Sequence, residues 1–163
     1  MTDNRTARIF LTVLLSLSAA FCKSETKPAA QPIDTAFAAL QDRGRMAMGV
    51  DQYTSTHHFE ATDQGGRIEL QRDSVDSLGV AQIRAHLKLI QHAFQAGDFS
   101  TPAFVHMRDM PGTAVMKEKR DAIEYSYADL PRGGEVRIRT ADPAALAAIR
   151  QFMDAQNMDH RAH

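Results

Sequence analysis

An internal repeat is the feature of this sequence that most limits what the chain can fold into. A glycine pair at 65–66 follows Phe59 at the same spacing as a second pair, at 133–134, follows Tyr127. After each pair comes a segment in which apolar and polar residues alternate, as in a strand, and then a stretch with the apolar spacing of a helix. We interpret the two halves as two strand-strand-helix units related by a pseudo-twofold axis.

Caps and periodicity predict the individual elements. Asp34 or Thr35 can cap a short helix that stops at Gly49, and Asp142 followed by Pro143 is a strong start for the last helix. We place each glycine pair in the turn of a hairpin. The predicted elements are the first helix up to residue 48, strands at 53–60, 67–71, 114–119, 123–127 and 136–138, a helix at 78–96 and a last helix from 143 to about 157.

These elements predict an α+β fold. Two such units bury their helices by laying both of them on one face of a shared antiparallel sheet. We therefore expect a two-layer sandwich, with an antiparallel sheet of about five strands and two main helices on one face. The strand at 114–119 is then an addition between the two units.

The first residues have the pattern of a secretory signal. Arg5 and Arg8 precede an apolar stretch at 9–17, which is shorter than a membrane-spanning helix requires and is followed by small residues. We expect an exported protein that resides in the periplasm. The predicted divisions are a signal segment at 1–22, a flexible tether at 23–34, a single α+β domain at 35–158 and a frayed tail at 159–163.

Cys22, the only cysteine, leaves two forms of export open. It stands where the lipid-bearing cysteine of an outer-membrane lipoprotein would stand, and the polar segment after it suits a tether. The bulky Phe21 directly before it disfavours lipidation and favours a soluble periplasmic protein. A single cysteine excludes an internal disulfide in either case.

Charge limits the range of partners. The formal net charge is −1, which gives no electrostatic attraction to nucleic acid or to an anionic membrane surface. We therefore expect no nucleic-acid partner, and membrane contact only through a lipid on Cys22. The partner is then an envelope protein or a small ligand.

The segment at 98–112 is predicted to be a recognition loop. It has no period and contains two prolines, yet it is rich in apolar residues, and long apolar loops in compact domains are uncommon unless they are functional. With the strand at 52–60, this loop is the predicted binding surface. Its predicted contact residues are Phe99, Phe104, Met107 and Met110.

Histidines indicate a second kind of site. His57 lies on the core side of its strand, His86 flanks the apolar stripe of its helix, and His106 lies in the loop that follows that helix. Folded together, the three imidazoles would form a copper or zinc site, with His160 as a further ligand. Met107 or Met110 would complete a copper site, and water a zinc site. The alternative reading is that these are hydrogen-bonded core histidines.

Catalytic motifs are absent from the sequence. It has no phosphate-binding glycine loop, no dinucleotide fingerprint, no Gly-x-Ser-x-Gly elbow and no His-Glu-x-x-His pair. A small enzyme of unknown reaction stays open as an alternative. It would require convergence of titratable groups drawn from His57, Glu60, His86, His106 and Asp109.

Several motifs resemble a family of small uncharacterised exported proteobacterial proteins. The matching segments are 48–57, 66–73, 97–99, 105–106, 111–113 and 130–136. Members sometimes carry the label aspartate carbamoyltransferase, which we reject for this chain. It is about half the length of such a catalytic subunit, lacks the Ser-Thr-Arg-Thr motif and is predicted to be exported away from carbamoyl phosphate. The resemblance implies no activity.

The leading hypothesis from sequence is a non-catalytic binding or accessory module of the bacterial cell envelope. The first alternative is a periplasmic copper- or zinc-binding protein. The second is the small enzyme described above.

Overall fold

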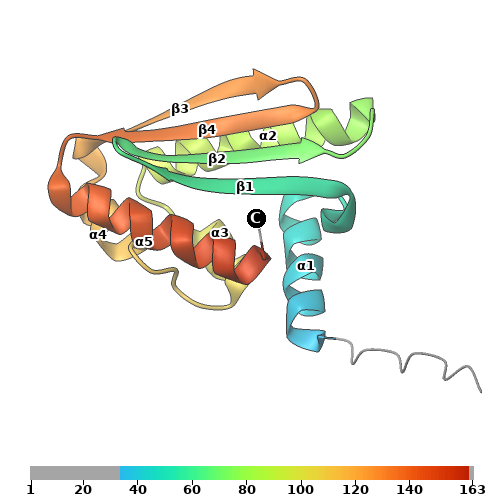
Figure 1. The fold of residues 1–163 in the computed structure, drawn as a ribbon, viewed down its shortest axis with the longest axis horizontal. Helices are drawn as coiled ribbons and strands as arrows, with labels where there is room; N and C mark the ends of the chain where they lie inside the picture. Colours follow the sequence, from blue (N-terminus) through green and yellow to red (C-terminus); the bar gives the residue numbers. More distant parts are fainter. Residues whose placement is uncertain (1–33, 162–163) are drawn as a thin grey trace, which may run out of the picture. The chain divides into compact units, whose positions relative to one another are not determined.

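The computed structural model describes residues 34–161, so the signal segment, Cys22, most of the tether and His163 lie outside the described residues. Within this range no helix is both long and apolar enough to cross a membrane. The elements, labelled in Figure 1, are α1 (Thr35–Met48), η1 (Gln52–Thr54), β1 (Ser55–Thr62), β2 (Gly65–Arg72), α2 (Ser77–Gln95), α3 (Ser100–His106), α4 (Thr113–Glu118), η2 (Arg120–Ala122), β3 (Ile123–Leu130), β4 (Gly133–Thr140) and α5 (Pro143–His160).

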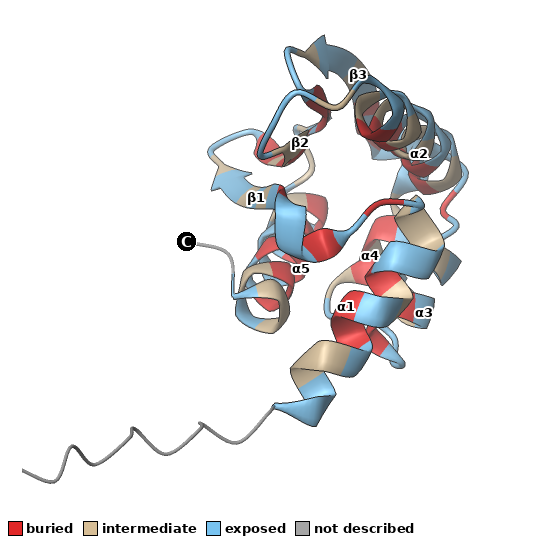
Figure 2. Cartoon of the chain, turned by 90° about the vertical axis from the view of Figure 1, so that its right-hand side faces the viewer, coloured by how far each residue is buried: buried red, intermediate tan, exposed pale blue. Residues whose placement is uncertain are grey.

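The fold is α+β, with one antiparallel sheet in the order β1-β2-β4-β3. At its centre β2 pairs with β4, placing Ile68 opposite Val136 and Glu69 opposite Glu135. Helix α5 packs mainly on β1 and also contacts β2 and β4, whereas α2 packs mainly on β3 and β4 and also contacts β2. Both helices lie on the same face of the sheet (Figure 1). Figure 2 shows that the buried residues of the helices are on their inward-facing sides. The duplication of the unit stays a prediction.

The described part of the chain has four strands, so the prediction of about five is wrong. Residues 114–119 belong mainly to α4, not to a strand. Thr113 and Met116 are its buried residues, and their spacing of three is that of one helical turn. Alternation over six residues cannot distinguish such a turn from a strand.

The glycine pairs lie inside strands β2 and β4, not in the hairpin turns where we placed them. The turns are at 63–64 and 131–132. A Cβ atom on Gly66 would lie 2.7 Å from Met153 Cε of α5, and one on Gly133 would collide with the Leu70 carbonyl oxygen. The glycines therefore permit close approach of a helix and of a neighbouring strand.

The helix ends are partly as predicted. Asp34 caps α1 by accepting a hydrogen bond from the Phe37 N–H, and Gly49 ends it with φ 75°. Asp142 caps α5 in the same way, with Pro143 as its first residue. Helix α5, however, continues to His160 and so includes two residues that we assigned to a frayed tail. Strand β1 begins at Ser55, because the preceding residues form the short helix η1.

The predicted recognition loop is also corrected. Its residues 100–106 form α3, in whose first turn Pro102 is tolerated because the N–H there has no helical partner. Phe99 and Met110 are largely buried, at 9% and 3% exposed, although both contribute to the lining of a surface pocket. Phe104 and Met107 are exposed, at 47% and 70%.

A histidine-lined cavity as the candidate functional site

Four histidines from four elements line one cavity beneath the sheet. They are His57 of β1, His86 of α2, His106 of α3 and His160 of α5, and the cavity has a volume of about 70 Å³. The other lining residues are mainly apolar and include Met48 of α1. Among residues 34–161 no aspartate or glutamate lines the cavity. Imidazoles are therefore its principal polar groups.

Three of the rings contact one another. The ring of His160 lies against that of His57 with centroids 5.2 Å apart and an interplanar angle of 18°. His106 meets His160 edge-on, with centroids 5.1 Å apart and planes at 82°. The ring of Phe59, also on β1, stacks on that of His160 with centroids 5.4 Å apart, so the His160 ring lies on the inner side of β1.

Both ring nitrogens of His106 lie within hydrogen-bonding distance of a protein side chain. Its Nδ1 donates to the Asp159 carboxylate at 2.7 Å, because a carboxylate can only accept, and its Nε2 lies 3.0 Å from Gln156 Oε1. Arg108 donates to the same Asp159 oxygen at 2.6 Å. Each ring nitrogen of His106 thus has a protein partner, as expected of a satisfied core histidine.

The other three cavity histidines are held neutral. Burial lowers the pKa of His57 to about 4, with repulsion from His86 and His58 adding to the effect. Burial likewise lowers the pKa of His86 to about 4, although the Ala47 carbonyl opposes the shift. The pKa of His160 falls to about 3 for the same first reason, with further repulsion from His57 and His106 and partial opposition from Asp159. At neutral pH each of these rings has an unprotonated nitrogen.

One of these nitrogens has no partner. His57 is half-buried as a residue, but its Nε2 is fully buried and makes no hydrogen bond in the structure. A buried polar atom without a partner costs free energy, so such an atom in a cavity wall indicates a binding site. We found no other unpartnered buried side-chain nitrogen within residues 34–161.

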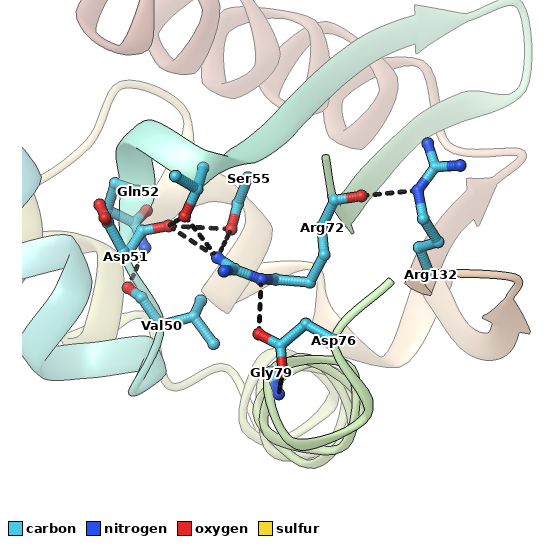
Figure 3. A network of polar contacts seen from close by, with 9 residues as sticks. Val50, Asp51, Gln52, Ser55, Arg72, Asp76, Gly79 and Arg132 are labelled. Atoms are coloured by element: carbon cyan, nitrogen blue, oxygen red, sulfur yellow. Dashed lines mark hydrogen bonds and ion pairs between the residues drawn. The ribbon is translucent and has the colours of Figure 1, made fainter. Parts of the chain in front are cut away.

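A network around Arg72 fixes the strand and the helix that carry His57 and His86 (Figure 3). Arg72 Nε donates to Asp76 at 3.1 Å, and Asp76 caps the start of α2. Arg72 Nη1 donates to the Asp51 carbonyl at 3.1 Å and to Ser55 Oγ at 2.8 Å, where β1 begins. One guanidinium thereby links β2 to the origins of both elements.

Helix α3, which carries His106, is also joined to α1 by a long-range hydrogen bond. Arg43 of α1 donates from Nε to the Val105 carbonyl of α3 at 2.7 Å. This bond holds α3, and with it His106, against α1. Met48 lies at the end of the same helix.

The structure thus places the three predicted metal ligands, His57, His86 and His106, around one cavity, together with His160, the predicted further ligand. As they are packed, however, no three or more His, Cys, Asp or Glu side chains in residues 34–161 are arranged to hold a metal ion. Neither Glu60 nor Asp109 lines the cavity, and both are exposed. The carboxylates proposed for the enzyme alternative are therefore not brought to the histidines.

The signal that sequence reasoning missed lies in the last helix. The side chains of Gln156 and Asp159 hold His106, and Asn157 donates to the Phe59 carbonyl of β1 at 2.7 Å. Continued helical spacing through His160 would have placed it on the same side as Gln156, one turn away.

Comparisons with protein-family models, with curated proteins and with solved structures found no significant match to the chain. The resemblance to exported proteobacterial proteins stays a prediction, and the function must be argued from the cavity.

Proposed function

We propose that the protein is a non-catalytic binding module of the bacterial cell envelope, and that it takes a small ligand into the histidine-lined cavity. The observation that carries the proposal is the unpartnered, fully buried Nε2 of His57 in the wall of that cavity. A ligand that bonded to this nitrogen would remove the cost of leaving it unpaired.

The size of the cavity limits the ligand. Since a water molecule occupies roughly 30 Å³ in the liquid, a volume of about 70 Å³ suits an ion or a very small molecule, or one end of a larger one. The mainly apolar wall and the neutral imidazoles disfavour a strongly charged organic ligand. Recognition in this proposal is by the cavity, with α3 as one wall, instead of by an exposed loop.

Residence in the envelope is the second part of the proposal. It is supported by the signal-like pattern of residues 1–22, with either a soluble periplasmic form or an outer-membrane form lipidated on Cys22. Exposed Phe104 and Met107 leave room for contact with an envelope protein. We retain duplication of a strand-strand-helix unit as the proposed origin of the scaffold.

Mass spectrometry of protein isolated from envelope extracts tests both parts. We expect the denatured chain to have lost the residues before Cys22 or Lys23, and the native protein to carry additional non-covalent mass. The added mass should disappear in His57→Phe and persist in His58→Phe, because His58 points away from the cavity and is exposed. An unprocessed Met1 would refute export, and equal native and denatured masses would refute the ligand.

A further inference from the structure

We propose that the ligand of the cavity is an uncharged aliphatic alcohol, whose hydroxyl group bonds to His57 Nε2 and whose neighbouring carbon atoms lie on the apolar floor of the cavity. This inference rests on the proposed function, because it names the chemical class of the ligand for the same site. The alcohol is either a free small molecule or the hydroxyl-bearing end of a larger one.

The polar contact of the ligand is set by a single buried atom. His57 Nε2 lies in the cavity wall without a partner. The other unpartnered buried side-chain atoms in residues 34–161 belong to Gln41, Gln52 and Tyr125, none of which lines the cavity. His106 already has a partner on each ring nitrogen. A hydroxyl group can both donate and accept, so it satisfies His57 Nε2 in either neutral tautomer of the ring.

The floor of the cavity requires an apolar group beside that hydroxyl. We define the floor as Leu70, Leu87, Phe94 and Phe152, which line the cavity and are each at most 2% exposed. Alkyl carbons gain dispersion contacts with such a surface and are removed from water. A buried water typically makes about three hydrogen bonds, which this floor does not supply. A carboxylate or an ammonium group would be buried there without a counter-charge.

The volume of the cavity limits how much of the ligand it encloses. A cavity of about 150 Å³ accommodates the six carbons of benzene, so about 70 Å³ accommodates about three non-hydrogen atoms. These are the hydroxyl oxygen and the first two carbons of an aliphatic alcohol. The cavity is not fully enclosed, so the rest of a longer chain extends outward from it.

Solution NMR of the dialysed protein, with 1-propanol as the probe, tests the inference. We expect 1-propanol to bind at least tenfold more tightly than 1-chloropropane, which has the same number of non-hydrogen atoms but no hydroxyl group. Nuclear Overhauser effects should connect the hydroxyl-bearing carbon to the ring of His57, and the following carbons to Leu70 or Leu87. Propionate and propylammonium should each bind at least tenfold more weakly than 1-propanol, because each brings a charge into the cavity.

A pair of variants separates the hydrogen bond from packing. His57→Phe keeps a ring and removes its nitrogens, so the preference for 1-propanol over 1-chloropropane should disappear. His92→Phe, at an exposed position of α2 that does not line the cavity, should leave the preference unchanged. If His57→Phe fails to fold, the ratio of the two affinities and the Overhauser contacts in the unsubstituted protein still decide the question.

A series from ethanol to 1-hexanol distinguishes the two sources of the alcohol. An affinity that continues to rise beyond 1-propanol indicates the end of a larger molecule, because the added carbons then contact the protein outside the cavity. An affinity that stops rising at 1-propanol indicates a free short alcohol.

The outcomes that overturn the inference differ from those that overturn the proposed function. Equal affinity for 1-propanol and 1-chloropropane, tighter binding of either charged probe, or water alone at His57 would each refute the alcohol. A native ligand that lacks an alcoholic hydroxyl would likewise refute the alcohol and leave the binding module intact. A cavity that takes up none of the probes, together with equal native and denatured masses, would refute both proposals.

Discussion

Acid should destabilise the protein well above the pH at which its carboxylates protonate. His57 and His86 have folded-state pKa values of about 4 and His160 of about 3, whereas an unfolded histidine titrates near 6.5. Between those values the unfolded chain binds protons that the folded chain does not. Stability is therefore complete above about pH 6.5 and is lost progressively as the pH falls toward 4.

The groups that surround these rings set the size of the effect. Beside burial, repulsion from His86 and His58 lowers the pKa of His57, and repulsion from His57 and His106 lowers that of His160, where Asp159 partly opposes the shift. At pH 4.5, about two pH units below the pKa of an unfolded histidine, one fully buried histidine that stays neutral lowers the free energy of unfolding by at most about 2.7 kcal/mol. Because the rings are only partly enclosed and repel one another, we expect about 1 kcal/mol each, or roughly 3 kcal/mol together, at pH 4.5.

Chemical denaturation of the protein at pH 7 and pH 4.5 measures this difference directly. His57→Phe removes one titrating group, so it should reduce the pH dependence by about one third. His92→Phe is the control: it replaces an exposed histidine of α2 that does not line the cavity, and it should leave the pH dependence unchanged. Equal free energies of unfolding at the two pH values, or equal slopes for the two variants, would show that these histidines are not buried as neutral groups.

Two further predictions concern the scaffold that positions the cavity. Arg72→Met should lower the free energy of unfolding by about 2 kcal/mol, because it removes the hydrogen bonds that join β2 to the starts of β1 and α2. In the same urea titration, the control Arg139→Met, at an exposed position, should change that free energy by less than about 0.5 kcal/mol. Phe152→Ala should lower the free energy of unfolding by about 3 to 5 kcal/mol, since Phe152 is 1% exposed in the core. A melting temperature equal to that of Met158→Ala, a substitution at an exposed position, would contradict this packing.

Helix caps and long apolar periods in the sequence predicted the helices well, whereas the secondary structure of short segments was predicted less well. Asp34, Gly49 and the Asp142-Pro143 pair act locally, so their effect is readable without tertiary information. The secondary structure of residues 114–119 is determined by the burial of Met116, which is fully buried as part of a single helical turn. Tertiary burial, invisible in six residues, selects helix over strand there.

The glycine pairs illustrate a different limit. Glycine marks both turns and positions of close backbone approach, and sequence alone does not distinguish them. At Gly66 the deciding neighbour is Met153, which is 87 residues later in the chain. The same spacing in both halves was visible, but its structural cause was not.

The candidate site shows what sequence could and could not supply. Strand alternation and the helix stripe placed His57 and His86 on the core side, and both do line the cavity. The partners of His106, by contrast, are on a helix about fifty residues away, and they determine which of its nitrogens remain available. Periodicity indicates which side chains face inward, whereas the hydrogen bonds of the folded chain decide which of those are already satisfied.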